Sequence, residues 1–309
     1  MQLAGDRVLD CPERSVSRIE WPTLALGAVI YAMFVGLTWF YASLPWPVLV
    51  IGGGVVVAWH GSFQHELIHG HPTRLAWFNR ALGLPGLALF LPFDRYAALH
   101  IAHHRDDVLT DPLEDPETYY WTAASWTALP IWARAIVTAS SCLAGRLVFG
   151  PVWMIARFLQ AEVGRWRRNE PGVRRAWAWH LPVAGLILGW VWGICGIDPA
   201  HYALMFVLPG TSLLMIRSFA EHRAAPDADR RTATVEQAGL FGLLFLFNNL
   251  HAAHHERPGI PWYRLPRWYR GERERLLQKN GGLIYRGYAE VMKRYFLHHH
   301  DQIVHPYRP

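Results

Sequence analysis

The chain has 309 residues, a length that suits either two soluble domains or one compact membrane protein. Its composition favours the membrane protein and excludes a disordered, fibrous or coiled-coil one: 52% of the residues are hydrophobic, 16 are tryptophan, and only 17% are charged, where an ordinary globular chain carries about a quarter. The formal charge of +6 is modest, so no nucleic-acid partner is expected, and the three separated cysteines offer neither a disulfide framework nor a zinc–thiolate site.

Two long stretches without lysine or arginine, residues 21–73 and 176–216, contain the predicted membrane spans. About 20 apolar residues cross a bilayer, so each stretch has room for a helical hairpin. Tryptophan and tyrosine lie near the first turn, where aromatic side chains favour the membrane interface. The four predicted spans are residues 22–42, 47–69, 177–197 and 200–222.

The basic residues predict the orientation of these spans. Both hairpin turns lack lysine and arginine, so the positive-inside rule places both termini and the middle segment, residues 72–175, in the cytoplasm. A polar stretch precedes the first apolar run, so no cleavable signal peptide is expected, and in a bacterium the membrane would be the inner one. We expect a cytoplasmic tail at 1–21, a membrane domain at 22–258 and a cytoplasmic cap at 259–309.

Three further apolar stretches are too short or too charged to cross a membrane. Residues 81–93 and 238–250 are only about 13 residues each, which predicts short interfacial helices. Residues 126–158 are interrupted by arginines, which favours amphipathic helices lying on the membrane surface. The expected fold is therefore an all-α integral membrane protein with a helical cytoplasmic cap.

Seventeen histidines is a high number, and eight of them form three groups at helical spacing. The groups are His65 with His69, His100 with His103 and His104, and His251 with His254 and His255. Residues three or four apart lie on one helix face, so each group can aim its imidazoles at one point. A single pair of this kind is more often a polar helix face, but three groups together favour metal ligands.

Helix length places a further histidine at the same depth. At 1.5 Å per residue, the helix from residue 47 to His65 covers about 27 Å and the helix from residue 200 to His222 about 33 Å, so both emerge near the cytoplasmic boundary. His222 is therefore a candidate ninth ligand, although a lone histidine at a helix end is commonly solvated. Imidazole suits Fe, Zn, Cu and Ni, and nine ligands are too many for one ion, so two ions are implied.

Other polar residues near the groups admit two roles. Carboxylates near the groups could accept the second N–H of a ligating imidazole, or could equally be surface charges. These carboxylates are Glu66, Asp111 and Glu221. The remaining histidines are expected to be structural: His60, His71 and His180 in the core or at helix ends, and His298–His300 with His305 at a solvated end.

The motifs HELIH, HIAHH and HAAHH, in this order beside two hairpins, closely resemble the three histidine boxes of the membrane fatty acid desaturase superfamily, which includes alkane hydroxylases and carotenoid oxygenases. The resemblance covers about residues 22–258. It implies that the nine histidines hold two iron ions (Fe2+/Fe3+), that O2 is the co-substrate, and that a lipid C–H bond is attacked. No flavin, haem or iron–sulfur motif is present, so electrons would come from an external ferredoxin, rubredoxin or cytochrome.

The departures from the family pattern concern the iron site. Relatives often place asparagine one turn before the extra histidine, where this chain has Ser218, and Asn248 and Asn249 before the third box could compensate. The spacing of the second box is that of desaturases. The resemblance therefore favours a fatty acyl desaturase. Its alternatives with the same centre are a lipid or alkane hydroxylase, a carotenoid ketolase or hydroxylase, and a fatty acid decarboxylase that forms a terminal alkene.

Two alternatives lie outside this superfamily. HELIH also matches the HExxH zinc-protease motif, with Glu66 as general base, but a protease would leave the other two groups without a purpose. A histidine-rich metal transporter would hold its site near mid-membrane, whereas these histidines are expected at the membrane edge. Metal identity and stoichiometry distinguish the three functions.

Overall fold

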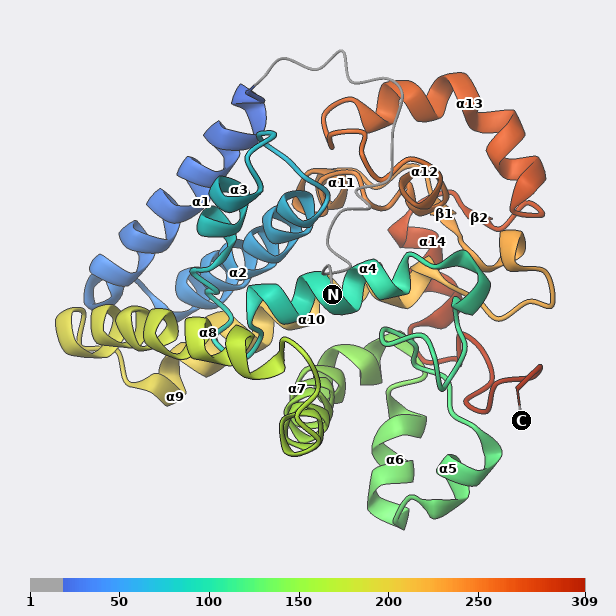
Figure 1. Ribbon diagram of the computed structural model, residues 1–309, viewed down its shortest axis with the longest axis horizontal. Coiled ribbons are helices and arrows are strands. Elements are labelled where there is room, and N and C mark those ends of the chain that lie inside the picture. Colours follow the sequence, from blue (N-terminus) through green and yellow to red (C-terminus); the bar gives the residue numbers. More distant parts are fainter. Residues whose placement is uncertain (1–18, 309) are drawn as a thin grey trace.

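The computed structural model describes residues 19–308, so most of the expected tail at 1–21 lies outside the described residues. The described part is an all-α membrane protein, and Figure 1 shows its helices in chain order. The first two spans are α1 (Trp21–Trp39) and α2 (Trp46–Ile68). The third span, Val173–Ile194, begins with α8 (Val173–Leu188). The fourth span, Pro199–Glu221, contains α9 (Pro199–Tyr202) and α10 (Leu208–Glu221). The predicted four spans in two hairpins are confirmed.

Proline marks the start of three of these spans. Pro22, Pro47 and Pro199 each lie in the first turn, where the missing N–H has no helical partner to lose and the fixed φ suits a helix. The third and fourth spans each include a wider π-helical segment, at 189–194 and 203–207, on the side of the hairpin turn. The other ends of α2 and α10 carry histidines.

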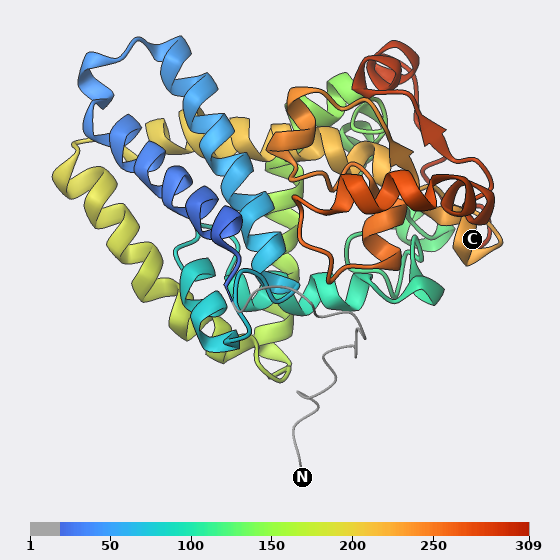
Figure 2. The ribbon, with the colours of Figure 1, turned by 90° about the horizontal axis from the view of Figure 1, so that it is seen from above.

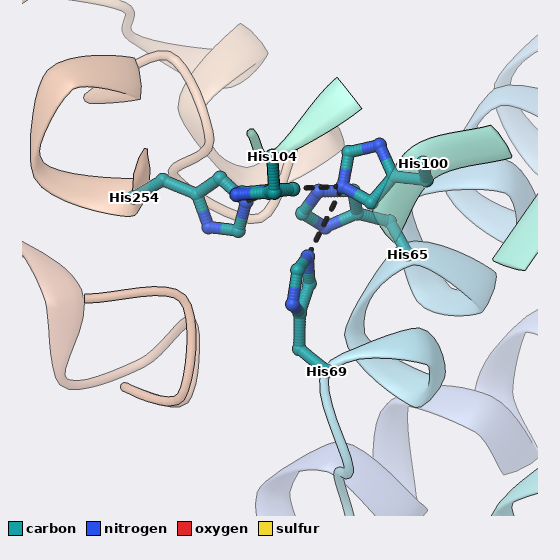
Figure 3. Close-up of side chains that lie close together, drawn as sticks. All are labelled: His65, His69, His100, His104 and His254. Carbon is teal, nitrogen blue, oxygen red and sulfur yellow. Dashed lines mark hydrogen bonds between the residues drawn. The ribbon is translucent and has the colours of Figure 1, made fainter. Parts of the chain in front are cut away.

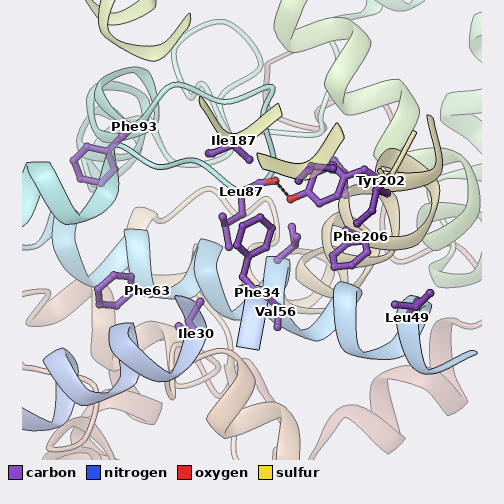
Figure 4. Close-up of a cluster of buried hydrophobic side chains, with 14 of the residues drawn as sticks. Ile30, Phe34, Leu49, Val56, Phe63, Leu87, Phe93, Ile187, Tyr202 and Phe206 are labelled. Carbon is purple, nitrogen blue, oxygen red and sulfur yellow. Dashed lines mark hydrogen bonds between the residues drawn. The ribbon is translucent and has the colours of Figure 1, made fainter. Parts of the chain in front are cut away.

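The closest packing in the membrane domain is between α2 and α10. A Cβ added to Gly210 would lie 2.6 Å from the Cβ of Val57, so only glycine permits this approach. Phe206 packs against Gly53 of α2 in the same way and stacks on Tyr202, and both rings are fully buried (Figure 4). The Tyr202 hydroxyl donates to the Leu87 carbonyl at 2.7 Å, which ties the loop after α3 to the core. The histidine-bearing ends of α2 and α10 are thereby held at a defined separation.

We predict that Gly210→Val lowers the melting temperature of the purified protein in detergent. The added side chain must displace Val57 or separate the helices, and overpacking of this kind costs about 1–3 kcal/mol. Gly185→Val is the matched control, because a Cβ at Gly185 on α8 meets nothing within 4 Å. Equal shifts in melting temperature for the two variants would contradict the close contact.

The middle segment forms five helices outside the spans. They are α3 (Ala76–Gly83), α4 (Phe93–His103), α5 (Ala123–Ala128), α6 (Ile131–Ala139) and α7 (Leu143–Arg167). Figure 1 shows α7 nearly end-on, whereas α8 and α10 run across the picture, and Figure 2 shows α7 between the spans and the cap. Val148, Val152, Leu159 and Val163 form an exposed apolar stripe on α7. The predicted helices in 126–158 are confirmed, and their place on the membrane surface stays a prediction.

The two other predicted short helices are much shorter in the structure than expected. Residues 84–92 form turns, because Gly83, Pro85, Gly86 and Pro92 interrupt any helix there. Within 238–250 only α11 (Leu240–Leu244) is helical, and the chain then turns sharply before the third histidine group. The 238–250 segment leads into the third histidine group, whereas the loop at 84–92 packs into the core of the spans through Leu87.

The C-terminal part forms a cap on one end of the helical bundle (Figure 2). Its helices are α12 (His251–Glu256), α13 (Leu265–Lys279) and α14 (Tyr288–Tyr295). Two short parallel strands, β1 (Thr234–Val235) and β2 (Ile284–Tyr285), pair with Thr234 opposite Ile284. The Val235 N–H donates to the Asn249 carbonyl at 2.8 Å, and the Ala252 N–H donates to the Ala233 carbonyl at 3.1 Å. The chain around β1 thus holds the third histidine group in place.

Candidate metal centre

Two compact clusters of imidazoles lie where α2, α4, α10 and α12 meet. In each cluster the candidate ligand atoms all lie within 4.8 Å of one another. The first cluster, drawn in Figure 3, contains His65, His69, His100, His104 and His254, and the second contains His103, His222, His251 and His255. The structure therefore brings together all nine predicted histidines.

Helical spacing explains how the second and third boxes divide between the clusters. On α4, His100 and His104, the residue that caps the helix C-terminus, are four apart and face the first cluster. His103 lies on another face of α4 and joins the second cluster. On α12, His251 and His255 are four apart and face the second cluster, while His254 joins the first. Each of these two short segments therefore contributes to both clusters, which places the clusters side by side.

Hydrogen bonds to the outer ring nitrogens orient the imidazoles. The Nδ1 atom of His103 lies 2.8 Å from Asp115 Oδ1, and that of His100 lies 2.9 Å from Glu117 Oε1. His222 directs Nδ1 at the Arg231 carbonyl at 3.3 Å. An N–H at Nδ1 leaves the Nε2 lone pair pointing inward, which is the arrangement of a ligating histidine with an anchoring acceptor.

The inward ring nitrogens lie so close together that a cation between them would be stabilising. His222 Nε2 lies 3.0 Å from His251 Nε2. His222 Nδ1 faces the Arg231 carbonyl, while His251 Nδ1 faces Asn248 Oδ1 at 3.1 Å and Glu221 Oε1 at 3.2 Å, so both protons belong on Nδ1. Two Nε2 lone pairs then face each other across 3.0 Å, and a shared cation between them would relieve the repulsion.

The spacing in the first cluster also fits a single ion. His100 Nε2 lies 3.1 Å from His69 Nε2 and 3.0 Å from His104 Nε2, and His104 Nε2 lies 3.1 Å from His254 Nε2. Two nitrogens bound at right angles to one ion, each at about 2.1 Å, are about 3.0 Å apart. The rings of His104 and His255 stack with centroids 4.3 Å apart across the boundary between the clusters, so the two candidate ion sites are neighbours.

Burial keeps most of these imidazoles neutral, which is the form that binds metal. Burial, and then the neighbouring histidines, hold the pKa of His254 and His255 well below the usual range. His103 is the exception: burial would lower its pKa, but Glu117 and Asp115 raise it to about 9. These carboxylates favour a positive charge at His103, which a proton or a bound cation can supply.

The three carboxylates predicted to orient the imidazoles, and Asn248, predicted to compensate for Ser218, have different surroundings. Glu221 lies beside His251, as expected, and its Oε1 also lies 2.8 Å from Arg217 Nε. Asn248 bridges the clusters, with Oδ1 at His251 and Nδ2 3.3 Å from His65 Nε2. Glu66 is less direct, because its Oε1 is 3.9 Å from His65 Nδ1.

Asp111 lies apart from the imidazoles that it was expected to orient. Its Oδ1 accepts the backbone N–H groups of Leu113 and Glu114, and its Oδ2 lies 3.1 Å from Arg308 Nε. These contacts stabilise the acidic loop after α4. The carboxylate that orients His103 is Asp115, further along the same loop.

Sequence reasoning missed the two carboxylates closest to the imidazoles, Asp115 and Glu117. The only signal for them was the acidic run after the second box. It also missed the backbone geometry before the third box, where Leu246 and Phe247 adopt left-handed conformations with φ of 49° and 57°. Such conformations are costly for side chains of this size and concentrate at functional sites. They turn the chain so that Asn248 and His251 reach the centre.

We predict that Asp115→Asn weakens metal binding at the second cluster by about 10–100-fold, because the amide no longer provides the charged acceptor that orients His103. Competition with a graded series of chelators would measure the loss. Asp107→Asn is the control, since the Asp107 side chain is 72% exposed and pairs with Arg105 at the surface. Unchanged metal affinity in Asp115→Asn would show that the hydrogen bond has no role in binding.

Comparisons with known proteins agree with this geometry. A family model described as fatty acid desaturase matches residues 37–287, which include all nine histidines. Among curated proteins, the β-carotene ketolase of Paracoccus sp. (strain N81106 / MBIC 01143) is 24% identical over 251 residues, covering 76% of this chain and 85% of the ketolase. The match to the ketolase therefore extends over most of both chains.

Proposed function

Since this chain belongs to the fatty acid desaturase family, we propose that it is an O2-dependent di-iron membrane oxidase that desaturates fatty acyl chains. The observation that supports the proposal most strongly is the pair of adjacent clusters with five and four histidines. Family membership establishes a membrane-embedded oxidoreductase of the desaturase type. The iron, the acyl substrate and the external electron donor, a ferredoxin, rubredoxin or cytochrome, are proposals.

The donor set fits two iron ions, one held by each cluster. Imidazole nitrogen suits iron, and carboxylates occur here as acceptors from Nδ1 rather than at the inward positions. When bound, the iron pair supplies O2 activation strong enough to remove hydrogen from a methylene group, which no side chain can do alone. The protein supplies orientation, through Asp115, Glu117 and Glu221, and a dry environment.

Exclusion of water is visible in the burial of the ligands. His65 and His103 are each 2% exposed and His254 is 3% exposed, so the clusters lie behind side chains rather than in an open cleft. A reactive centre that is shielded in this way attacks a bound substrate in preference to solvent. The clusters lie at the ends of α2 and α10, beside the apolar spans from which a lipid chain would approach.

The position of Glu66 argues against the zinc-protease alternative. A general base in HExxH must face the metal-bound water on the Nε2 side of its histidines. Glu66 instead lies on the Nδ1 side of His65, and its Oε2 accepts the Trp262 N–H at 3.0 Å. The carboxylate therefore joins the cap to α2 and points away from the cluster.

We propose that the metal centre faces the cytoplasm and that, in a bacterial cell, the protein lies in the inner membrane. The support is the charge distribution: the hairpin turns that face the other side carry no lysine or arginine, whereas the cap and the middle segment carry the basic residues. An electron carrier would then reach the centre from the compartment where such carriers are reduced.

A carotenoid ketolase is the second candidate, because the relative found among curated proteins is named β-carotene ketolase. Both reactions need the same oxidising centre, but they differ in what is added to the product. Desaturation removes two hydrogens and adds no oxygen, whereas ketolation places an oxygen atom on the ring.

Product analysis under 18O2 separates the two candidates. The protein, reconstituted in nanodiscs with a ferredoxin and its reductase, would be given phospholipid and β-carotene together. We expect that acyl chains become two mass units lighter only when O2 is present, and that they carry no 18O. A β-carotene product carrying 18O would establish the ketolase instead. Absence of any O2-dependent product from the iron-loaded protein with these two substrates would contradict the proposed activity.

A further inference from the structure

The C-terminal segment 298–305 folds back beside the metal centre. His300 and His305 are 5% and 2% exposed, so the expectation of a solvated end was wrong for both. The Trp121 N–H donates to the Ile303 carbonyl at 3.0 Å, which fastens the segment to the loop after α4 (Figure 1). The segment lies beyond residues 37–287, so the family match does not account for it.

Two hydrogen bonds connect this segment to His222, and a third holds His300 from its other side. The Tyr119 hydroxyl donates to the His222 carbonyl at 2.9 Å, so its oxygen is left as an acceptor. His300 Nδ1 lies 3.3 Å from that oxygen and must carry the proton. His300 Nε2 then accepts from the Tyr285 hydroxyl at 3.0 Å. The donors all point one way, from Tyr285 through His300 and Tyr119 to His222.

This directional chain requires a neutral His300 with one donor and one acceptor nitrogen. Burial lowers the pKa of His300 to about 4, so the ring is neutral near pH 7. Phe219 and Tyr295 pack on the ring, with centroids 4.9 Å and 4.8 Å away, and fix its plane. The ring therefore has a defined orientation as well as a defined charge.

A second connection holds the residues that follow His222. The Ala224 N–H donates to the Tyr120 hydroxyl oxygen at 2.8 Å, and the Tyr120 hydroxyl donates to Asp301 Oδ2 at 2.5 Å. Arg223 Nε lies 3.4 Å from the same carboxylate oxygen. Residues 222–224 are thus tied at both ends to Tyr119, Tyr120 and the C-terminal segment.

His222 needs such support more than the other histidines do. It stands alone in the sequence, and α10 ends at Glu221, one residue before it. Its backbone is extended, with φ −131° and ψ 146°, so it depends on contacts outside α10, which are an antiparallel bridge to Thr232 and the hydrogen bond from Tyr119. The other eight histidines lie in boxes whose members are positioned by a shared helix.

We propose that the C-terminal segment is a latch that positions His222 in the second cluster through Tyr119 and His300. The proposal rests on His222 binding metal, as set out under the proposed function. Tyr119 and His300 are positioning residues: Tyr119 touches the backbone of His222, His300 acts through Tyr119, and neither belongs to a histidine cluster. Loss of the latch should therefore weaken the second metal site while leaving the first intact.

The test compares iron release from Tyr119→Phe and from Tyr307→Phe during a chelator challenge. Both changes remove one hydroxyl, but Tyr307 is 50% exposed and lies outside the chain of hydrogen bonds. We expect Tyr119→Phe to release one of its two irons about 10–100-fold faster, with loss of one of two Mössbauer signals, and Tyr307→Phe to match the unmodified protein. Faster hydrogen exchange of residues 223–224 in metal-free Tyr119→Phe should accompany the loss.

A second pair of variants covers the case in which Tyr119→Phe folds poorly. In His300→Gln the amide can still donate to Tyr119 and accept from Tyr285, so both irons should be retained, whereas His300→Leu should release one. Wild-type release from both Tyr119→Phe and His300→Leu, or equal loss of both irons, would overturn the latch. His222→Ala separates this failure from a wrong metal assignment: if it also retains both irons, His222 is not a ligand.

Discussion

Replacing His103 by alanine should remove iron from the second cluster and reduce O2-dependent turnover by more than about 100-fold, while the four spans stay folded. His103 is 2% exposed, its Nε2 lies 3.0 Å from that of His222, and alanine supplies no nitrogen in its place. The buried core of the spans does not include this residue, so the helix content in detergent should change little. Elemental analysis, turnover and circular dichroism measure the three quantities.

The control for this variant is His201→Ala. His201 is exposed in α9, at the hairpin turn between the third and fourth spans, and belongs to neither cluster. It should keep full iron content and activity. Full activity in His103→Ala would remove His103 from the set of ligands, and unfolding of that variant would show that the histidine stabilises the protein in addition to binding metal.

The largest expected loss of stability comes from Glu162→Gln. Glu162 on α7 is 2% exposed and accepts two hydrogen bonds from Arg95 on α4, at 2.8 and 2.9 Å, and one from Trp177 on α8. The variant leaves the Arg95 guanidinium buried without its countercharge, and removing one partner of a buried ion pair costs about 3–5 kcal/mol. Glu170→Gln is the control, because its side chain is 39% exposed and such surface pairs contribute about 1 kcal/mol or less.

This ion pair also makes stability depend on pH. Burial would raise the pKa of Glu162, but hydrogen bonds from Arg95 and Trp177 hold it below its ordinary value. A carboxyl with a depressed pKa stabilises the fold above its unfolded pKa of about 4.3 and loses that contribution as the pH falls through the folded value. The melting temperature of the wild-type protein should fall more steeply below about pH 5 than that of Glu162→Gln. Parallel profiles would contradict the assignment.

The spans and the histidine boxes could be predicted because their signals are local. Apolar length and the absence of charge define a span, and helical spacing brings His65 to His69 or His251 to His255 without knowledge of the fold. His222 was found by counting residues along a helix of known rise. These arguments rely on regular geometry that repeats from one residue to the next.

The supporting residues could not be found in this way, because their positions depend on irregular backbone. Asp115 reaches His103 through a loop in which Thr110 adopts φ 68°, and Asn248 follows the left-handed Leu246 and Phe247. His300 contacts Tyr119 although the two are 181 residues apart in the sequence. Sequence patterns near each residue give no sign of these long-range contacts. The carboxylates that orient the imidazoles and the C-terminal latch could therefore be found only from the structure.

Metal content of the detergent-purified protein tests the central claim most directly. The account predicts about two irons per chain by elemental analysis, and a clear loss in His254→Ala, because His254 contributes to the first cluster. His299→Ala, outside both clusters, should retain both irons. One zinc per chain that is indifferent to His254 would contradict the di-iron assignment and restore the HExxH protease as the better explanation.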